Sequence, residues 1–149
     1  MRIYADTSVF GGCFDEDFEQ DSIELFDEIR NGRFILILST TTMRELERAP
    51  EQVRQVVAGL PPEQIEMQEL SDEIERLRDA YLDAGVVGPA SKLDAEHVAC
   101  ATVALADLIV SWNFKHIVHF DRIRAYHSVN LVQGYRPIPI HSPKEVIET

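Results

Sequence analysis

The 149-residue sequence has few cysteines, few basic residues and no long apolar run. Its only cysteines are Cys13 and Cys100, too few for a disulfide framework, and the histidines fall outside zinc-site spacing with them. No apolar stretch approaches the ~20 residues that cross a bilayer. The N-terminus lacks the basic start and apolar stretch of a signal peptide. We therefore expect a cytoplasmic protein with reduced cysteines and no membrane partner.

Basic residues are scarce: 14 Lys and Arg stand against 26 Asp and Glu, for a net charge of −12. This excess argues at first against a nucleic-acid partner. The distribution weakens that argument, because residues 1–107 hold 23 acids and 9 basic residues whereas residues 108–149 hold 3 and 5. The basic residues of the second part could form a surface for a phosphate backbone or be ordinary solvated side chains: Lys115, Arg122, Arg124 and Arg136.

Length and a hydrophobic fraction of 45% predict one domain over residues 1–149. Short apolar segments rich in β-formers alternate with longer amphipathic ones. Strands are expected at 2–5, 34–38, 65–67, 108–111 and 138–140. Helices are expected at 18–30, 51–58, 71–84, 94–106 and 119–130, with a further helix opening at Thr42, on which Glu45 lies, and another after Ser142. This alternation predicts a three-layer α/β/α sandwich with a mainly parallel central sheet.

Ligands of such sheets bind beyond the carboxyl ends of the strands. Four polar residues can be placed at that edge although they lie far apart in the sequence: Asp6, Glu45, Asp94 and Asn113. Hard oxygen ligands gathered at one point bind Mg²⁺ or Mn²⁺, and such an ion can drive phosphodiester hydrolysis. The pattern therefore favours an enzyme with a divalent metal.

Each of these residues also has a purely structural explanation. Asp6 could cap a short helix that follows it, and Asn113 could be a turn residue. The spacings Thr42-x-x-Glu45 and Ser91-x-x-Asp94 both fit a capping box, in which the acid bonds back to the start of its own helix. No single position is decisive, so the argument for a metal site is the joint pattern.

Other polar and aromatic residues near these four in the sequence are not expected to bind the metal. Asp107 precedes a strand, and four residues at ~3.3 Å each put it at the opposite edge of the sheet. Glu96 and His97 lie off the sheet-facing stripe of their helix, so we expect them on the surface. Trp112 and Phe114 are typical of core or rim residues, with base stacking as the alternative.

Four blocks of the sequence together resemble the PIN-domain family. They are Ala-Asp-Thr-Ser-Val at 5–9, Arg-Glu-Leu at 44–46, Leu-Asp-Ala-Glu-His-Val-Ala at 93–99 and Ala-Asp-Leu-Ile-Val-Ser-Trp-Asn-Phe at 106–114. The resemblance runs from residue 2 to about 118, and weakly to 147. It implies a Mg²⁺- or Mn²⁺-dependent ribonuclease with an RNA substrate. Many small members are VapC-like toxins, commonly homodimers, each inhibited by an antitoxin protein whose peptide covers the acidic site.

Carried over by the resemblance, Asp6, Glu45 and Asp94 are the carboxylates and Ser111 is a supporting hydroxyl. Asn113 stands where the family often has Asp, which lowers the charge of the site by one and should weaken a second metal. Our hypothesis is that Asp6, Asp94 and Asn113 hold the ion, while Glu45 orients a water ligand of the ion or a second ion.

Substrate contacts are assigned to the polar residues around these four. The scissile phosphate is expected to meet Thr7 or Ser8, with Ser111 and Lys115 as further substrate-binding residues. Arg44 and Arg48 flank Glu45, and could pair with it or reach a phosphate.

Two rival functions are kept. One is a catalytically weak or inactive module that binds RNA or a protein partner. The other is phosphoryl transfer with Asp6 as nucleophile, although Ser8 stands where phosphatases of the haloacid type have a second Asp. The RNA target cannot be predicted, because its recognition depends on surface shape and stacking.

Overall fold

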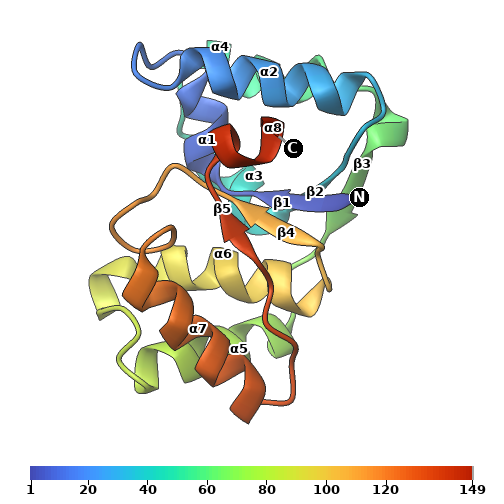
Figure 1. The fold of residues 1–149 in the computed structure, drawn as a ribbon. Helices are drawn as coiled ribbons and strands as arrows, with labels where there is room; N and C mark the ends of the chain where they lie inside the picture. The colour runs from blue at the N-terminus through green and yellow to red at the C-terminus, as the bar shows by residue number, and fades with distance from the viewer. Residues whose placement is uncertain (149) are drawn as a thin grey trace.

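The computed structural model describes residues 1–148 and shows strands alternating with helices (Figure 1). The strands are β1 (Arg2–Ala5), β2 (Ile35–Ser39), β3 (Ile65–Gln68), β4 (Leu108–Val110) and β5 (Ile140–His141). They form a sheet of order β3-β2-β1-β4-β5, and each pairing in it is parallel. The prediction of a parallel sheet is therefore confirmed.

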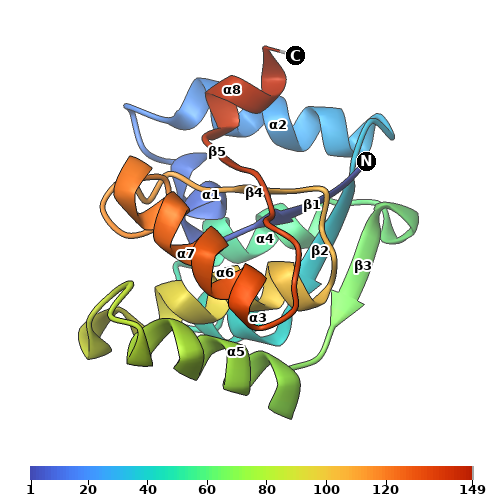
Figure 2. The ribbon, with the colours of Figure 1, turned by 60° about the horizontal axis from the view of Figure 1, so that its bottom comes forward.

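Helices cover both faces of this sheet, which confirms the three-layer α/β/α sandwich (Figures 1 and 2). One face carries α1 (Thr7–Gly12), α2 (Glu19–Arg30), α4 (Glu51–Ala58) and α8 (Pro143–Ile147). The other face carries α5 (Asp72–Asp83), α6 (Lys92–Val103) and α7 (Phe120–Val132). The short helix α3 (Thr40–Leu46) follows β2, and single 3₁₀ turns lie at Pro62–Gln64 and Pro89–Ser91. No helix among residues 1–148 is long and apolar enough to cross a bilayer.

The strands contribute side chains to two separate hydrophobic cores, because successive side chains of a strand point to opposite faces of the sheet. In β1, Ile3 and Ala5 join the core under α1 and α2, whereas Tyr4 joins the core under α6. In β2, Ile37 likewise faces α6. Strands buried on both faces have almost continuous apolar sequences, which is why these segments could be recognised.

Helix starts differ from the predicted capping boxes. Ser39, and not Thr42, caps α3: its hydroxyl accepts a hydrogen bond from the Thr42 backbone N–H at 3.1 Å. The Ser91 side chain makes no capping hydrogen bond at the start of α6. Both predicted boxes are therefore wrong, and the carboxylates of Glu45 and Asp94 are not used as caps. The box at Ser142 does form.

Helix α6 also ends earlier than the predicted residue 106. Leu105 adopts φ of 56°, a left-handed conformation that ends a helix. Its carbonyl accepts hydrogen bonds from the side chains of Arg2 and Arg136. The apolar sequence continues past the end of the helix although Leu105 is exposed, because Ala106 is buried and Ala104 is half-buried.

The chain order places a crevice beside β1. From β1 the chain goes through α1 and α2 to β2 on one side, and it returns through α5 and α6 to β4 on the other. Neighbouring strands whose connections leave in opposite directions open a crevice at their carboxyl ends. Asp6 lies at that point, with its backbone N–H bonded to the carbonyl of Val110 at the end of β4.

Candidate functional site

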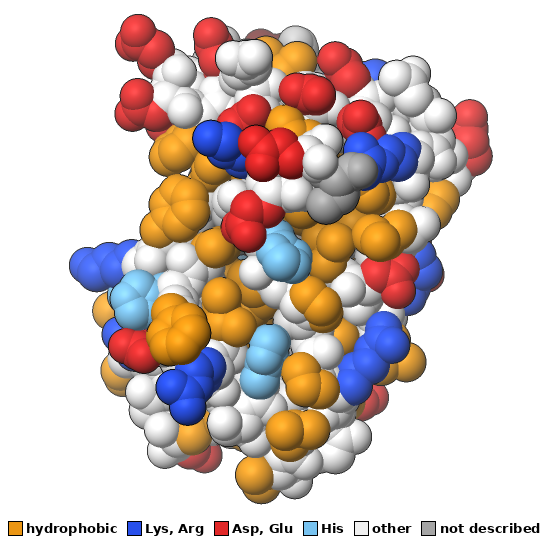
Figure 3. All heavy atoms as spheres, viewed as in Figure 1, with side chains coloured by type: hydrophobic (Ala, Val, Ile, Leu, Met, Phe, Trp, Pro, Cys, Tyr) orange, Lys and Arg blue, Asp and Glu red, His pale blue; other side chains and the backbone are white. Residues whose placement is uncertain are grey.

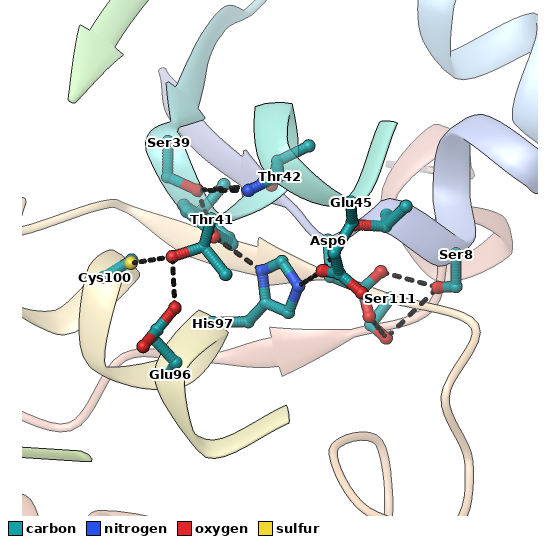
Figure 4. A network of polar contacts seen from close by, with 12 residues as sticks. Asp6, Ser8, Ser39, Thr41, Thr42, Glu45, Glu96, His97, Cys100 and Ser111 are labelled. Atoms are coloured by element: carbon teal, nitrogen blue, oxygen red, sulfur yellow. Dashed lines mark hydrogen bonds and ion pairs between the residues drawn. The ribbon is translucent and has the colours of Figure 1, made fainter. Parts of the chain in front are cut away.

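Asp6 is a buried carboxylate at the carboxyl end of β1, with only 4% of the residue exposed. Its Oδ1 accepts a hydrogen bond from the Ser8 hydroxyl at 2.5 Å, and its Oδ2 accepts one from the Ser111 hydroxyl at 2.8 Å (Figure 4). The Ser8 hydroxyl in turn accepts the backbone N–H of Trp112 at 2.9 Å. The loops after β1 and β4 are thus tied together through this one carboxylate.

Burial raises the pKa of Asp6 above its ordinary value, and the nearby charge of Asp94 raises it further. The charge of His97 and the hydroxyls of Ser8 and Ser111 lower this pKa but do not outweigh burial. The charge of Asp6 is therefore only partly compensated by the protein. A bound cation would favour its ionised form.

Glu45 lies in the second turn of α3 and reaches the same crevice. Its Oε1 accepts a hydrogen bond from the Thr7 hydroxyl at 2.8 Å and contacts Nε2 of His97. Burial raises the pKa of Glu45, but the hydrogen bond and charge of His97, together with Thr7, outweigh burial and lower this pKa overall. Glu45 is therefore held ionised.

His97 was predicted to lie on the surface, and that prediction is wrong: the residue is 2% exposed. Its Nδ1 lies 2.7 Å from the Tyr4 hydroxyl and its Nε2 contacts Glu45 (Figure 4). Burial lowers the pKa of His97, but Glu45, Asp6 and Asp94 outweigh burial and raise it overall. The spacing Asp94-x-x-His97 could have revealed this placement, because residues three apart share one helix face.

Glu96 was also predicted to be exposed, and it too is buried, at 6%. One of its carboxylate oxygens accepts from the Arg78 guanidinium at 2.6 Å, and the other accepts from the Thr41 hydroxyl at 2.6 Å. Glu96 therefore joins α6 to α5 and α3. Its partners, Arg78 and Thr41, differ from those of His97.

Asp94 lies half-buried in the first turn of α6. Its charge raises the pKa of Asp6, His97 and Tyr126, so it lies within electrostatic range of these residues. Its carboxylate makes no hydrogen bond or ion pair with the residues that the structure describes. It is the candidate ligand with both oxygens available.

Asn113 follows β4, and its side chain has a local partner. The Oδ1 atom accepts the backbone N–H of His116 at 2.9 Å, and the Asn113 backbone N–H donates to Ser111 Oγ at 2.9 Å. Asn113 is thus a turn residue, as in the structural alternative. Its carbonyl oxygen keeps a second lone pair for a ligand.

The predicted substrate contacts fall into two groups. The hydroxyls of Thr7, Ser8 and Ser111 face inward and orient Glu45 and Asp6. Lys115 is exposed and makes no ion pair with residues 1–148. Asp107 lies at the amino end of β1, where it accepts the Arg2 backbone N–H at 2.7 Å, so its predicted place at the opposite edge of the sheet is confirmed.

The predicted basic surface is largely used within the fold. Arg122 donates to the Val86 carbonyl at 2.7 Å, Arg136 donates to the carbonyls that end α6, and Arg124 lies over the Phe120 ring. Of the four residues, Lys115 and Arg124 are exposed and make no ion pair with residues 1–148.

A pocket of about 600 Å³ opens next to Glu45. It is lined by Thr41, Arg44, Glu45, Glu47, Arg48, Leu93 and Glu96. Arg44 and Arg48 are exposed on its rim and form no ion pair with Glu45. Their charges are therefore available to a ligand.

The donor set fits a hard divalent cation by its chemistry, because it consists of carboxylate and amide oxygens. Within residues 1–148, no three acidic, His or Cys side chains are already arranged around a common metal position. Asp94 offers a carboxylate without partners, and Asp6 carries a charge that a cation would stabilise. Neither the protein-family models nor the curated proteins searched contain a match to this chain.

Proposed function

We propose that this protein is a metal-dependent endoribonuclease that hydrolyses RNA phosphodiester bonds. The observation that supports this most is Asp6, a buried carboxylate with a raised pKa at the crevice beside β1, on which the charge of Asp94 acts. Glu45 reaches the same crevice from α3, where it contacts Thr7 and His97, although among the residues that the structure describes no three acidic, His or Cys side chains surround one metal position. A buried carboxylate such as Asp6 is costly without a cation, and perturbed carboxylates in a crevice are typical of active sites.

Asp6, Asp94 and Asn113 would hold Mg²⁺ or Mn²⁺ in this proposal. When bound, the ion supplies Lewis-acid stabilisation of negative charge at phosphorus and makes water a better nucleophile. Ser8 and Ser111 keep both oxygens of Asp6 in fixed directions. The fold thereby prepares the first ligand before any metal binds.

Glu45 is assigned the orientation of water. Its lowered pKa makes it a weak proton acceptor at neutral pH. Thr7 and His97 fix its Oε1, so its other oxygen is left for a water molecule or a second ion. His97 is a positioning residue on this view, since it acts through Glu45.

Replacing the acidic ligands tests the proposal. Asp6→Asn and Asp94→Asn should each abolish Mn²⁺-dependent cleavage of single-stranded RNA while the circular dichroism spectrum stays unchanged. Asp107→Asn is the matched control, because this acid lies at the opposite edge of the sheet, and it should cleave as the wild type does. Cleavage at wild-type rate by both ligand variants would refute the assignment.

A catalytically weak module that binds RNA or a protein is the second candidate. It is favoured by Asn113, an uncharged residue whose carbonyl already accepts the His116 N–H. Asn113→Asp would separate the two functions: an active nuclease should gain metal-dependent activity, whereas a binding module should remain inactive yet still bind RNA.

The proposal extends to a VapC-like toxin with an antitoxin partner and a homodimeric state. Its support is the resemblance of the four sequence blocks alone. Co-expression with the product of the neighbouring gene would test the antitoxin: relief of growth arrest supports it, and unchanged arrest opposes it.

A further inference from the structure

Three aromatic side chains form a cluster next to the acidic site, and the proposed chemistry does not use them. Trp112 stacks on Phe18, with ring centroids 4.3 Å apart and an interplanar angle of 21°. Phe114 meets Trp112 edge-on at 6.0 Å and lies 6.4 Å from Phe18. We call Phe18, Trp112 and Phe114 the aromatic cluster.

The aromatic cluster is joined to Asp6 by short connections. Trp112 directly follows Ser111, which donates to Asp6, and its backbone N–H donates to Ser8, which donates to the other oxygen of Asp6. A ligand on the cluster would therefore lie beside the first candidate metal ligand.

The indole ring of Trp112 is held in a fixed position. Its Nε1 donates to the Ser22 hydroxyl at 2.7 Å. A Cβ atom at Gly12 would come within 2.8 Å of Nε1, so only glycine leaves the ring room to lie against α1. The cluster is thus a rigid surface, and its stacking geometry is set before any ligand arrives.

Phe114 is the exposed end of the cluster. Its side chain is 48% exposed although it is apolar. Figure 3 shows hydrophobic side chains gathered at the left of the molecule, at the end of the sheet where α1 and the segment after β4 lie. Exposed aromatic surface beside a polar crevice is typical of a binding site.

The chemistry around Phe114 favours a nucleotide over a protein segment. An apolar ring, a free lysine (Lys115) and an acidic crevice lie side by side, and a nucleotide presents a flat base and a phosphate to match them. An unpaired base can leave its neighbours and stack on a ring, whereas a base in a duplex cannot.

We propose that Phe114, backed by the Trp112–Phe18 stack, is a base-stacking platform for single-stranded RNA. It holds an unpaired base while Lys115 contacts the backbone and the adjoining phosphate lies at Asp6. This inference deepens the proposed nuclease function and rests on it for the identity of the ligand. Stacking alone tolerates all bases, so the platform selects unpaired over paired RNA.

Fluorescence gives a direct test, because Trp112 is the only tryptophan in the chain. The titrant is a 12-nucleotide RNA without secondary structure, and the same RNA annealed to its complement is the comparison. Titrations use the wild type in EDTA and Asp6→Asn in Mn²⁺, so that cleavage does not interfere. The single strand should quench the fluorescence saturably, and the duplex should bind much more weakly.

Variants of the platform sharpen the test. Phe114→Ala should weaken single-strand binding roughly 5- to 100-fold, the usual effect of removing one base–ring stack, and Phe114→Tyr should retain affinity because the ring remains. Phe120→Ala is the matched control, since Phe120 is 72% exposed and makes no ring contact with the cluster. Lys115→Gln should weaken binding and make it less sensitive to salt.

The outcomes separate this inference from the proposed function. Tight binding through Phe114 without cleavage in Mn²⁺ supports the platform and refutes the nuclease. Cleavage and binding by Phe114→Ala at wild-type levels refute the platform alone. Binding of the duplex as tightly as the single strand also overturns the platform. So does Trp112 fluorescence that changes with protein concentration, because a second copy of the chain would then cover Phe114.

Discussion

His97 joins strand β1 to helix α3 within the candidate site. It contacts both the acid of α3, Glu45, and the buried hydroxyl of β1, Tyr4. The Tyr4 hydroxyl continues to Ser39 at 2.8 Å, and Ser39 caps α3. A chain of hydrogen bonds therefore runs from the start of α3 through β1 and α6 back to Glu45 on α3. Its geometry orients Glu45 without using the metal.

The Glu45–His97 pair predicts a dependence of stability on pH. Folding raises the pKa of His97 from 6.5 and lowers that of Glu45 from 4.5. The stability that Glu45 contributes is lost as pH falls through its pKa in the folded state. The stability that His97 contributes is lost as pH rises through its pKa in the folded state. The pair therefore stabilises the folded state most between these limits.

We expect His97→Gln to lower the melting temperature more at about pH 6 than at about pH 9, since the stabilisation from the charge of His97 is lost as pH rises through its raised pKa. Thermal unfolding in EDTA measures this without interference from metal. His119→Gln changes an exposed histidine and should have the same small effect at both pH values. An equal loss for His97→Gln at the two pH values would contradict a charged pair.

At the scale of elements, helix α6 shows what the sequence can and cannot reveal. Its small residues are buried in the core between the helix and the sheet: Ala95, Ala99 and Ala101. The burial of Glu96 and His97 was missed because only the sheet-facing stripe was considered. In the structure every residue from Ala95 to Thr102 is buried, since α3 and α5 cover the remaining sides. Polar partners from two other helices leave no periodic signal in the sequence.

The buried pair of Arg78 and Glu96 fastens α5 to α6. Their side chains are 9% and 8% exposed, and the guanidinium donates to Glu96 at 2.6 Å. Breaking a buried pair leaves an uncompensated charge, with a cost of about 3–5 kcal/mol. Asp79 still contacts Arg78 at 3.0 Å, so the lower end of that range applies here.

We therefore expect Glu96→Leu to reduce the free energy of unfolding by about 3 kcal/mol in urea denaturation. Adding Arg78→Met should restore most of the loss, because no buried charge then remains. Glu75→Leu is the control: this exposed acid lies 3.9 Å from Arg78 and should change stability by less than about 1 kcal/mol. A double variant no more stable than Glu96→Leu alone would argue against this explanation.

For the whole molecule, the sequence predicted the layers of the fold and the end of the sheet at which Asp6 and Asn113 lie. Asp6 and Asn113 were placed there because each follows a buried strand, and Asp107 was excluded by the length of β4. Whether Glu45 and Asp94 were caps or site residues could not be decided from spacing, because a capping box and a ligand have the same local sequence. At α3 the structure excludes the capping box, because Ser39 takes the capping role.

A divalent cation should stabilise the whole fold, because only the folded chain brings Asp6 and Asp94 together. A ligand that binds only the folded state at ten times its Kd adds about 1.4 kcal/mol. For a domain of this size that raises the melting temperature by about 3–6 °C. Differential scanning fluorimetry with Mn²⁺ and Mg²⁺ measures the rise. Asp6→Asn and Asp94→Asn should lose it, whereas Asp107→Asn, which keeps its contact with Arg2, should retain it. An equal rise in Asp6→Asn would mean that the cation binds elsewhere on this acidic protein, and the metal site would have to be abandoned.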